Sequence, residues 1–200
     1  WAGTNAVFDW AAPESIEAEL YRAYQIENFD TVFLKGSLQG GAQIAIAASH
    51  ACAEPSPLLE KVEFENATLE YEIGFAHRIR WADGKVEEGE PDNIDRLLEN
   101  VSSYIQYLRG ERDRPYTRLI DSRPFVELFD LCYVAAGKIN TIPGEQLEEV
   151  KDDKGNQHLR IKDLKPAAEK FLEKEEFPST QGIEWAASGG QADIGRLPEF

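Results

Sequence analysis

The sequence contains few of the residues that support metal, disulfide or membrane chemistry. It has no Met, two Cys and three His in 200 residues. No Cys-x-x-Cys or His-x-x-x-His pair occurs, which argues against a structural zinc site. Polar residues interrupt the longest apolar stretch well before the roughly 18 residues that a transmembrane helix needs. The first ten residues have no basic region, so we also expect no secretory signal peptide. We therefore expect no metal, no cofactor and no membrane association.

Positive charge is scarce as well. There are 21 Lys and Arg against 37 Asp and Glu, which gives a net charge of −16. Such a chain repels nucleic acid and anionic membranes and favours encounter with basic proteins. Cys52 and Cys132 both lie in apolar patterns, and buried thiols are a better interpretation than a disulfide. Reduced thiols indicate a cytoplasmic protein.

Catalytic motifs are missing from the sequence. There is no Gly-x-Ser-x-Gly elbow around Ser49-His50, and nothing local marks Cys52 or His77 as reactive. No Gly-x-Gly-x-x-Gly occurs, and no Lys-Ser or Lys-Thr follows the glycines of residues 36–41, so nucleotide binding is not indicated. Acidic pairs are so numerous that any choice of general acid and base would be arbitrary. These observations predict a protein that is not an enzyme.

Asp30–Ala51 is the stretch around which the rest of the chain is organised. From Gly40 to Cys52 almost every residue is small or aliphatic. A helix that is apolar all round must be covered on most sides, so we predict a buried central helix. Gly40 and Gly41 disfavour a helix interior. The alternative is a strand over residues 31–35, a glycine-containing loop and a helix that begins at Gly41.

Apolar spacing predicts the other elements. Spacings of three and four indicate helices that begin near residues 13, 91, 123 and 164. Alternation of apolar and polar residues indicates a three-stranded antiparallel meander over about 61–88 and a second hairpin over about 147–161. We predict a mostly α, α+β fold, in which about five helices form a bundle. Residues 1–178 are expected to form one globular domain and residues 179–200 an extended tail.

The meander is predicted to carry an acidic surface. If Asn66-Ala67 is the centre of a tight hairpin turn, Glu63 lies opposite Glu70 on the exposed face. Like charges directly opposite each other destabilise a sheet. Our hypothesis is that basic side chains of a partner relieve this repulsion. The predicted partner-binding residues are Glu63, Glu65, Glu70, Glu72, Glu87 and Glu88.

Residues 109–123 form the only net-positive stretch. Arg109, Arg112, Arg114 and Arg118 are candidates for an anion site. The alternative, which is the favoured one, is that these arginines and Arg123 pair with carboxylates and with carbonyl groups at helix C-termini.

A helical, acidic domain without catalytic motifs resembles the immunity proteins of bacterial toxin systems. The leading hypothesis is therefore a non-enzymatic binding protein, of immunity or inhibitor type, that masks a basic surface of a toxin or nuclease. The alternatives are a DNA mimic that occupies a nucleic-acid-binding protein, a helical protein that binds a small molecule, and an enzyme of unrecognised type.

Overall fold

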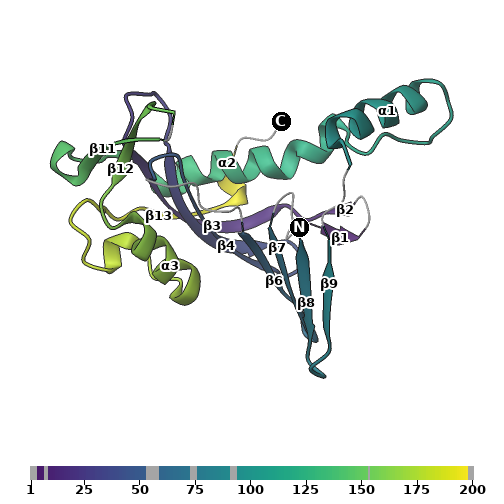
Figure 1. Cartoon of the computed structure of the whole chain (residues 1–200), viewed down its shortest axis with the longest axis horizontal. Helices are drawn as coiled ribbons and strands as arrows, with labels where there is room; N and C mark the ends of the chain where they lie inside the picture. Colours follow the sequence, from purple (N-terminus) through teal and green to yellow (C-terminus); the bar gives the residue numbers. More distant parts are fainter. Residues whose placement is uncertain are drawn as a thin grey trace. The chain divides into compact units, whose positions relative to one another are not determined.

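The computed structural model describes residues 4–6, 9–52, 59–72, 76–90, 94–152 and 154–197. The chain forms two compact units (Figure 1). The first unit comprises Pro55–Ser122, and the second comprises Ala2–Glu54 and Arg123–Phe200. The first unit is therefore inserted in the sequence of the second.

A five-stranded sheet forms the centre of the second unit. Strands β3, β4 and β5 are antiparallel neighbours in that order. Strand β10 runs parallel to one end of β3, and β13 runs antiparallel to its other end, so β10 and β13 share an edge of β3. The strands are β3 (Pro13–Arg22), β4 (Thr31–Leu38), β5 (Gln43–Ser49), β10 (Ile139–Thr141) and β13 (Gly190–Asp193).

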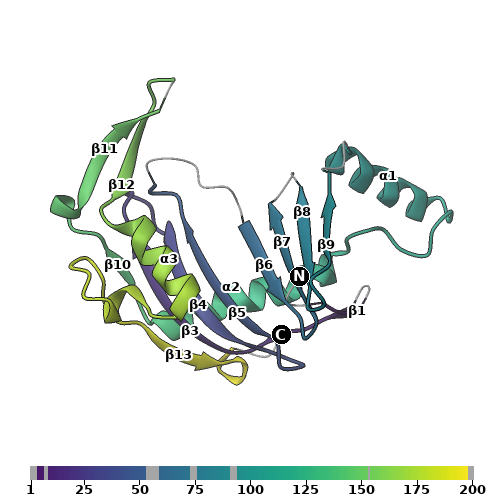
Figure 2. The same ribbon diagram turned by 60° about the horizontal axis from the view of Figure 1, so that its bottom comes forward.

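Helices cover both faces of this sheet (Figure 2). On one face, α2 (Arg123–Ala136) packs Leu131 against residues of β3 and β4 such as Leu20. On the other face, α3 (Leu164–Lys174) packs Phe171 against Phe33, with ring centroids 5.5 Å apart. Because alternate residues of a strand point to opposite faces, β3 and β4 contribute to both cores.

The expected central helix over Asp30–Ala51 is wrong, because β4 and β5 form an antiparallel hairpin there. Gly40 and Gly41 lie in its turn with φ of 92° and 90°, a conformation that suits glycine. The helix expected near residue 13 is also a strand, β3. A strand that is buried on both faces is apolar all round, as a buried helix is, so composition did not separate the two structures.

The predicted mostly α bundle of about five helices is therefore wrong. The described residues contain three α-helices and thirteen strands. None of these helices is long and apolar enough to span a membrane.

Shorter elements complete the second unit. Strands β11 and β12 form an antiparallel hairpin at the position where the sequence predicts one. Trp185 is buried, and its indole Nε1 donates a hydrogen bond of 2.8 Å to the carbonyl of Lys162. The elements are β1 (Thr4–Ala6), β2 (Asp9–Trp10), β11 (Leu147–Lys151), β12 (Gln157–Ile161) and the 3-10 helices η2 (Gly144–Gln146), η3 (Pro178–Thr180) and η4 (Ile194–Arg196).

The first unit contains a four-stranded antiparallel meander, one strand more than expected, followed by a helix. Helix α1 begins after Asp95, whose carboxylate accepts a hydrogen bond from the backbone N–H of Leu98. The elements of this unit are β6 (Leu59–Glu63), β7 (Ala67–Glu72), β8 (His77–Trp81), β9 (Val86–Gly89), α1 (Arg96–Leu108) and the 3-10 helix η1 (Leu119–Ser122).

Candidate functional site

The register of the meander differs from the predicted one. Glu63 lies opposite Thr68, and Glu70 lies opposite Lys61. The turn is centred on Glu65-Asn66, because the backbone N–H of Phe64 donates to the carbonyl of Ala67 at 2.8 Å. Moving the turn centre by one residue shifts the cross-strand pairing by two. The predicted Glu63–Glu70 repulsion is therefore absent.

Charges of opposite sign alternate across the exposed face of the meander. Lys61, Glu70, Arg78 and Glu88 form one cross-strand row. The cation beside Glu63 lowers the pKa of that carboxyl, first through the hydrogen bond from Lys61. A DNA mimic would need a continuous acidic stripe, and this face does not provide one. The ion pairs are Lys61–Glu63, Arg78–Glu88 (2.7 Å), Arg80–Glu70 (3.3 Å) and Lys85–Glu87 (2.6 Å).

Two arginines of the basic stretch share one carboxylate. Arg114 contacts Asp121 at 2.5 Å and Arg118 contacts it at 3.3 Å. The side chain of Asp121 is only 3% exposed. Arg112 instead lies over the ring of Tyr116, 4.3 Å from its centroid. The structure thus shows the pairing with carboxylates for Arg114 and Arg118, while the side chain of Arg118 remains about half exposed.

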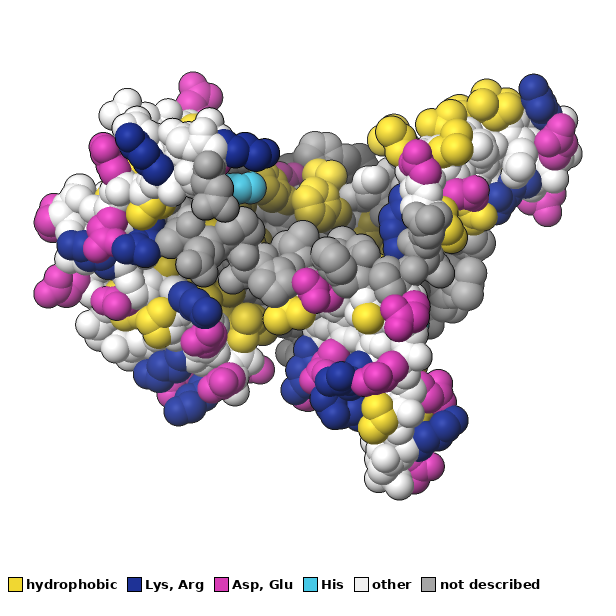
Figure 3. All heavy atoms as spheres, in the orientation of Figure 1, with side chains coloured by type: hydrophobic (Ala, Val, Ile, Leu, Met, Phe, Trp, Pro, Cys, Tyr) yellow, Lys and Arg dark blue, Asp and Glu magenta, His cyan; other side chains and the backbone are white. Residues whose placement is uncertain are grey.

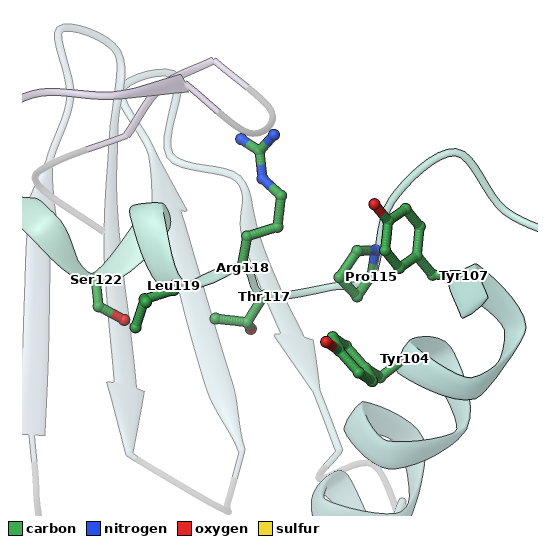
Figure 4. A pocket seen from close by; sticks show the side chains of 7 residues that line it. All are labelled: Tyr104, Tyr107, Pro115, Thr117, Arg118, Leu119 and Ser122. Carbon is green, nitrogen blue, oxygen red and sulfur yellow. The ribbon is translucent and has the colours of Figure 1, made fainter.

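A pocket of about 430 Å³ opens beside Arg118, within the first unit. Figure 4 shows the rings of Tyr104 and Tyr107 on its α1 side and Leu119 and Ser122 on the opposite side. The two tyrosine rings lie 6.2 Å apart. The lining residues are Tyr104, Tyr107, Pro115, Thr117, Arg118, Leu119 and Ser122.

Local packing of α1 positions the two tyrosines. Ser103 is buried, and its hydroxyl donates to the carbonyl of Asn100 at 2.9 Å and accepts from the backbone N–H of Tyr116 at 3.2 Å. This contact holds residues 115–122 beside the C-terminal half of α1. Gly110, with φ of 73°, ends the helix and reverses the chain. Tyr104 and Tyr107 consequently line the same flank of the helix.

The pocket offers a defined set of interactions. Phenol, Thr and Ser hydroxyls both donate and accept hydrogen bonds, and a guanidinium donates several in a plane. Aromatic rings supply flat apolar area beside these polar groups. Such a surface suits a small ligand that carries many hydroxyl groups or a carboxylate. The sequence offered a small-molecule-binding protein only as an alternative, because the apolar periodicity of α1 gave no sign that its tyrosines line a pocket.

The remaining chemical candidates do not form a site. The described residues contain no group of three or more His, Cys, Asp or Glu that could hold a metal ion. Both cysteines are free thiols, and burial raises the pKa of Cys132 to about 12, which keeps that thiol protonated and unreactive. His77 packs its ring against Gly89 of the neighbouring strand.

Two buried carboxylates of the second unit were not predicted. Glu19 accepts hydrogen bonds from the hydroxyls of Tyr21 and Ser179. Asp30 accepts two 2.8 Å hydrogen bonds from the backbone N–H groups of Ala23 and Tyr24. Both carboxylates fasten loops to the sheet. Glu19 lies inside β3 and Asp30 directly precedes β4, and these positions are visible only after the strands are known.

The glycine-rich turn does not fit a nucleotide. A phosphate-binding loop leads from a strand into a helix, whose N-terminal N–H groups hold the phosphates. Here the turn joins β4 to β5, and no helix follows it. The residues present at this turn therefore do not form a dinucleotide site.

No family model matches this sequence. The search of curated proteins also finds no match. Solved structures do match. UDP-N-acetylglucosamine 3-dehydrogenase GnnA from Acidithiobacillus ferrooxidans matches with a TM-score of 0.56 and 16% identity. An oxidoreductase from Agrobacterium radiobacter, in complex with NAD+, L-tartaric acid and magnesium, matches with a TM-score of 0.53 and 15% identity. Aldose-aldose oxidoreductase from Caulobacter crescentus, complexed with glycerol, matches at 0.53 with 14% identity.

The match to the Acidithiobacillus enzyme covers 62% of this chain and 41% of the matched chain. The matches to the Agrobacterium and Caulobacter enzymes each cover 64% of this chain, and they cover 42% and 40% of those two chains, respectively. The chain thus spans less than half the length of these structures. At such identities the comparison shows the fold alone. The expectation of a non-enzymatic immunity or inhibitor protein is nevertheless wrong, because the chain has the fold of part of several oxidoreductases.

Proposed function

We propose that this chain forms the substrate-binding part of an oxidoreductase that acts on a polyhydroxylated compound, such as a sugar or a hydroxy acid. The observation that carries the proposal is the fold shared with the matched oxidoreductases. Their names include a nucleotide-sugar dehydrogenase, an aldose oxidoreductase and an enzyme bound to tartaric acid. The two free thiols fit a reducing compartment such as the cytoplasm.

The chemistry of the pocket supports this class of ligand. Its volume of about 430 Å³ lies within the range of roughly 300–1,000 Å³ that is usual for small-molecule sites. Tyr104 and Tyr107 would contact the C–H faces of a sugar ring. Thr117 and Ser122 would exchange hydrogen bonds with its hydroxyl groups, and Arg118 would bind a carboxylate or hydroxyl oxygen.

The redox cofactor is proposed to be held outside this chain. NAD+ accompanies one of the matched structures. The glycine-rich turn between β4 and β5 does not provide the helix N-terminus that a dinucleotide needs. The role of the chain's own residues is therefore to bind and orient the substrate.

Ligand binding tests the pocket. We expect the chain to bind at least one compound from a panel of aldoses, sugar acids, L-tartrate and UDP-N-acetylglucosamine, measured by calorimetry, and to bind neither NAD+ nor NADP+. Arg118→Ala and Tyr107→Ala should each weaken this binding about tenfold, the cost of one charge-assisted hydrogen bond or one ring contact.

Arg112→Ala is the matched control, because Arg112 belongs to the same basic stretch but does not line the pocket. Its affinity should equal that of the wild type. The pocket assignment would be overturned if the chain bound no compound of the panel, or if the Arg112 and Arg118 variants lost equal amounts of ligand affinity.

Oxidoreductase activity is tested on the protein isolated from its natural source with an antibody against this chain. With NAD+ or NADP+ and the bound compound, reduced nicotinamide should appear as absorbance near 340 nm. Failure to reduce either nucleotide with any member of the panel would contradict the proposed reaction class.

A further inference from the structure

Helix α1 packs its polar side against the protein and presents its apolar side to solvent. Ser103 is buried against residues 115–116. With 3.6 residues per turn, Val101 lies on the opposite side of the helix from Ser103. Val101 is the centre of an outward-facing arc of six apolar residues. The arc consists of Leu97, Leu98, Val101, Tyr104, Ile105 and Leu108.

The arc is large for a surface without a partner. Its exposed fractions range from 43% for Ile105 to 75% for Leu97. Figure 3 shows hydrophobic side chains gathered along this helix. The arc exposes on the order of 600 Å² per chain. This area is larger than that of scattered apolar residues on a surface, and it approaches the roughly 800 Å² that each partner contributes to a standard protein interface.

The arc is symmetric along the helix. Leu97 and Ile105 lie equally far from Val101, and so do Leu98 and Tyr104. When two such helices lie antiparallel with their Val101 residues together, these apolar positions meet one another across the contact. A face that complements itself in this way is what a two-fold symmetric dimer requires.

The charges at the ends of the arc favour the antiparallel arrangement. Asp95 precedes α1 and Arg109 follows it, and helical spacing places both on the same flank of the arc. In an antiparallel pair, each flank of one arc faces the same flank of the other arc. Asp95 of one chain therefore comes within one helical turn of Arg109 of the other chain. The negative end of each helix dipole also lies beside the positive end of its neighbour.

We propose that the α1 arc binds the α1 arc of a second copy of this chain in an antiparallel pair centred on Val101. A lipid surface fits less well, because the chain carries a net charge of −16 and the polar side of α1 is not rich in Lys or Arg. The pair buries the apolar arc from water in both copies, with Tyr104 at the edge of the arc, where its ring also lines the pocket.

The oligomeric state measures this directly. By sedimentation equilibrium, the wild-type chain should dimerise at micromolar concentration. Val101→Glu should weaken the dimer roughly a hundredfold, because it places two carboxylates at the centre of the interface. Gln106→Glu is the matched control, since it adds the same charge on the opposite side of α1, and its dimer affinity should be unchanged. Circular dichroism verifies that both variants fold, and Leu98→Glu repeats the test at a second position.

Cross-linking tests the antiparallel arrangement. A mixture of Leu97→Cys and Ile105→Cys chains should form a disulfide under mild oxidation, whereas Leu97→Cys alone should not. The wild-type chain under the same oxidant controls for Cys52 and Cys132.

Three results would overturn the proposal. They are a chain that stays monomeric, a dimer that Val101→Glu and Leu98→Glu do not weaken, and a disulfide formed by Leu97→Cys alone, which would require a parallel pair. Binding of a monomeric wild-type chain to phosphatidylcholine–phosphatidylglycerol vesicles, lost in Val101→Glu, would assign the arc to a membrane instead.

Discussion

The Tyr21 hydroxyl donates a hydrogen bond of 2.6 Å to Oε2 of Glu19, although both side chains are buried. The same hydroxyl lies 3.1 Å from the carbonyl of Ala187, and Glu19 also accepts from Ser179. Glu19 and Tyr21 of β3 thus hold the segment after α3 against the sheet through hydrogen bonds.

Tyr21→Phe removes this hydroxyl and leaves the buried carboxylate with fewer donors. We expect the free energy of unfolding to fall by about 1–3 kcal/mol. Urea denaturation monitored by circular dichroism measures the loss. Tyr104→Phe, which removes a hydroxyl from a half-exposed ring, is the control and should change stability little.

Tyr21 also predicts a pH dependence. Burial, and then the hydrogen bond to Glu19, raises the pKa of Tyr21 above its ordinary value. The folded state therefore favours the protonated phenol. Its contribution is complete below the unfolded pKa of about 10 and declines as the pH rises above that value. The stability difference between wild type and Tyr21→Phe should shrink above about pH 10. A constant difference would contradict this assignment.

Gly36 lies where the strands leave no room for a side chain. A Cβ there would lie 2.1 Å from the backbone oxygen of Ser15 and 2.6 Å from Cδ1 of Ile16. Gly36→Ala should destabilise the second unit by about 3 kcal/mol or more, because the backbone of β3 would have to move. Thermal unfolding measures this loss.

Gly144→Ala provides the comparison, since no atom lies within 4 Å of the added Cβ. It should be neutral or slightly stabilising, as Gly→Ala is at a compatible position. Equal destabilisation by both variants would show that the close approach of the β3 backbone to Gly36 is not the cause of the stability loss.

Asp152 organises the turn of the β11–β12 hairpin. It accepts hydrogen bonds from the side chain of Asn156 at 2.7 Å and from the backbone N–H groups of Lys154 and Asn156. The hydrogen bond from Asn156 is the main cause that lowers the pKa of Asp152 to about 2.

This contribution is present above the unfolded pKa of about 3.9 and is lost as the pH falls through the folded pKa. Carbon-detected NMR titration of the carboxyl should give a midpoint near 2. Asn156→Ala should raise that midpoint. A midpoint near 3.9 in the wild type would rule out the turn hydrogen bonds as a persistent feature.

Glu70 lies between two cations on the exposed face of the meander, with Lys61 and Arg78 opposite it on the adjacent strands. Glu70→Lys places three cations in one row and should lower stability by less than about 1 kcal/mol, the scale of exposed pairs. The loss should diminish in high salt. Thr68→Lys places a cation between Glu63 and Arg80, so that it gains one favourable and one unfavourable neighbour, and serves as the comparison. An increase in stability for Glu70→Lys would indicate a different register.

The sequence by itself determined the features that local interactions control. Helices α1 and α2 follow from apolar spacing, and Gly110 and Gly137 end them with φ of 73° and 69°. The second hairpin follows from Asp152 and Asn156, whose hydrogen bonds span only four residues. Neighbours in the chain determine each of these features, so the sequence alone predicts them.

Tertiary structure decided the rest. Ala and Ile in residues 43–49 suit a strand and a helix alike, and antiparallel pairing with β4 made this stretch a strand. The turn of the meander lies one residue earlier than predicted, so Glu70 pairs with Lys61 and not with Glu63. The direction in which the α1 arc points depends on where Ser103 packs. These outcomes depend on contacts between residues far apart in the chain, which periodicity does not encode.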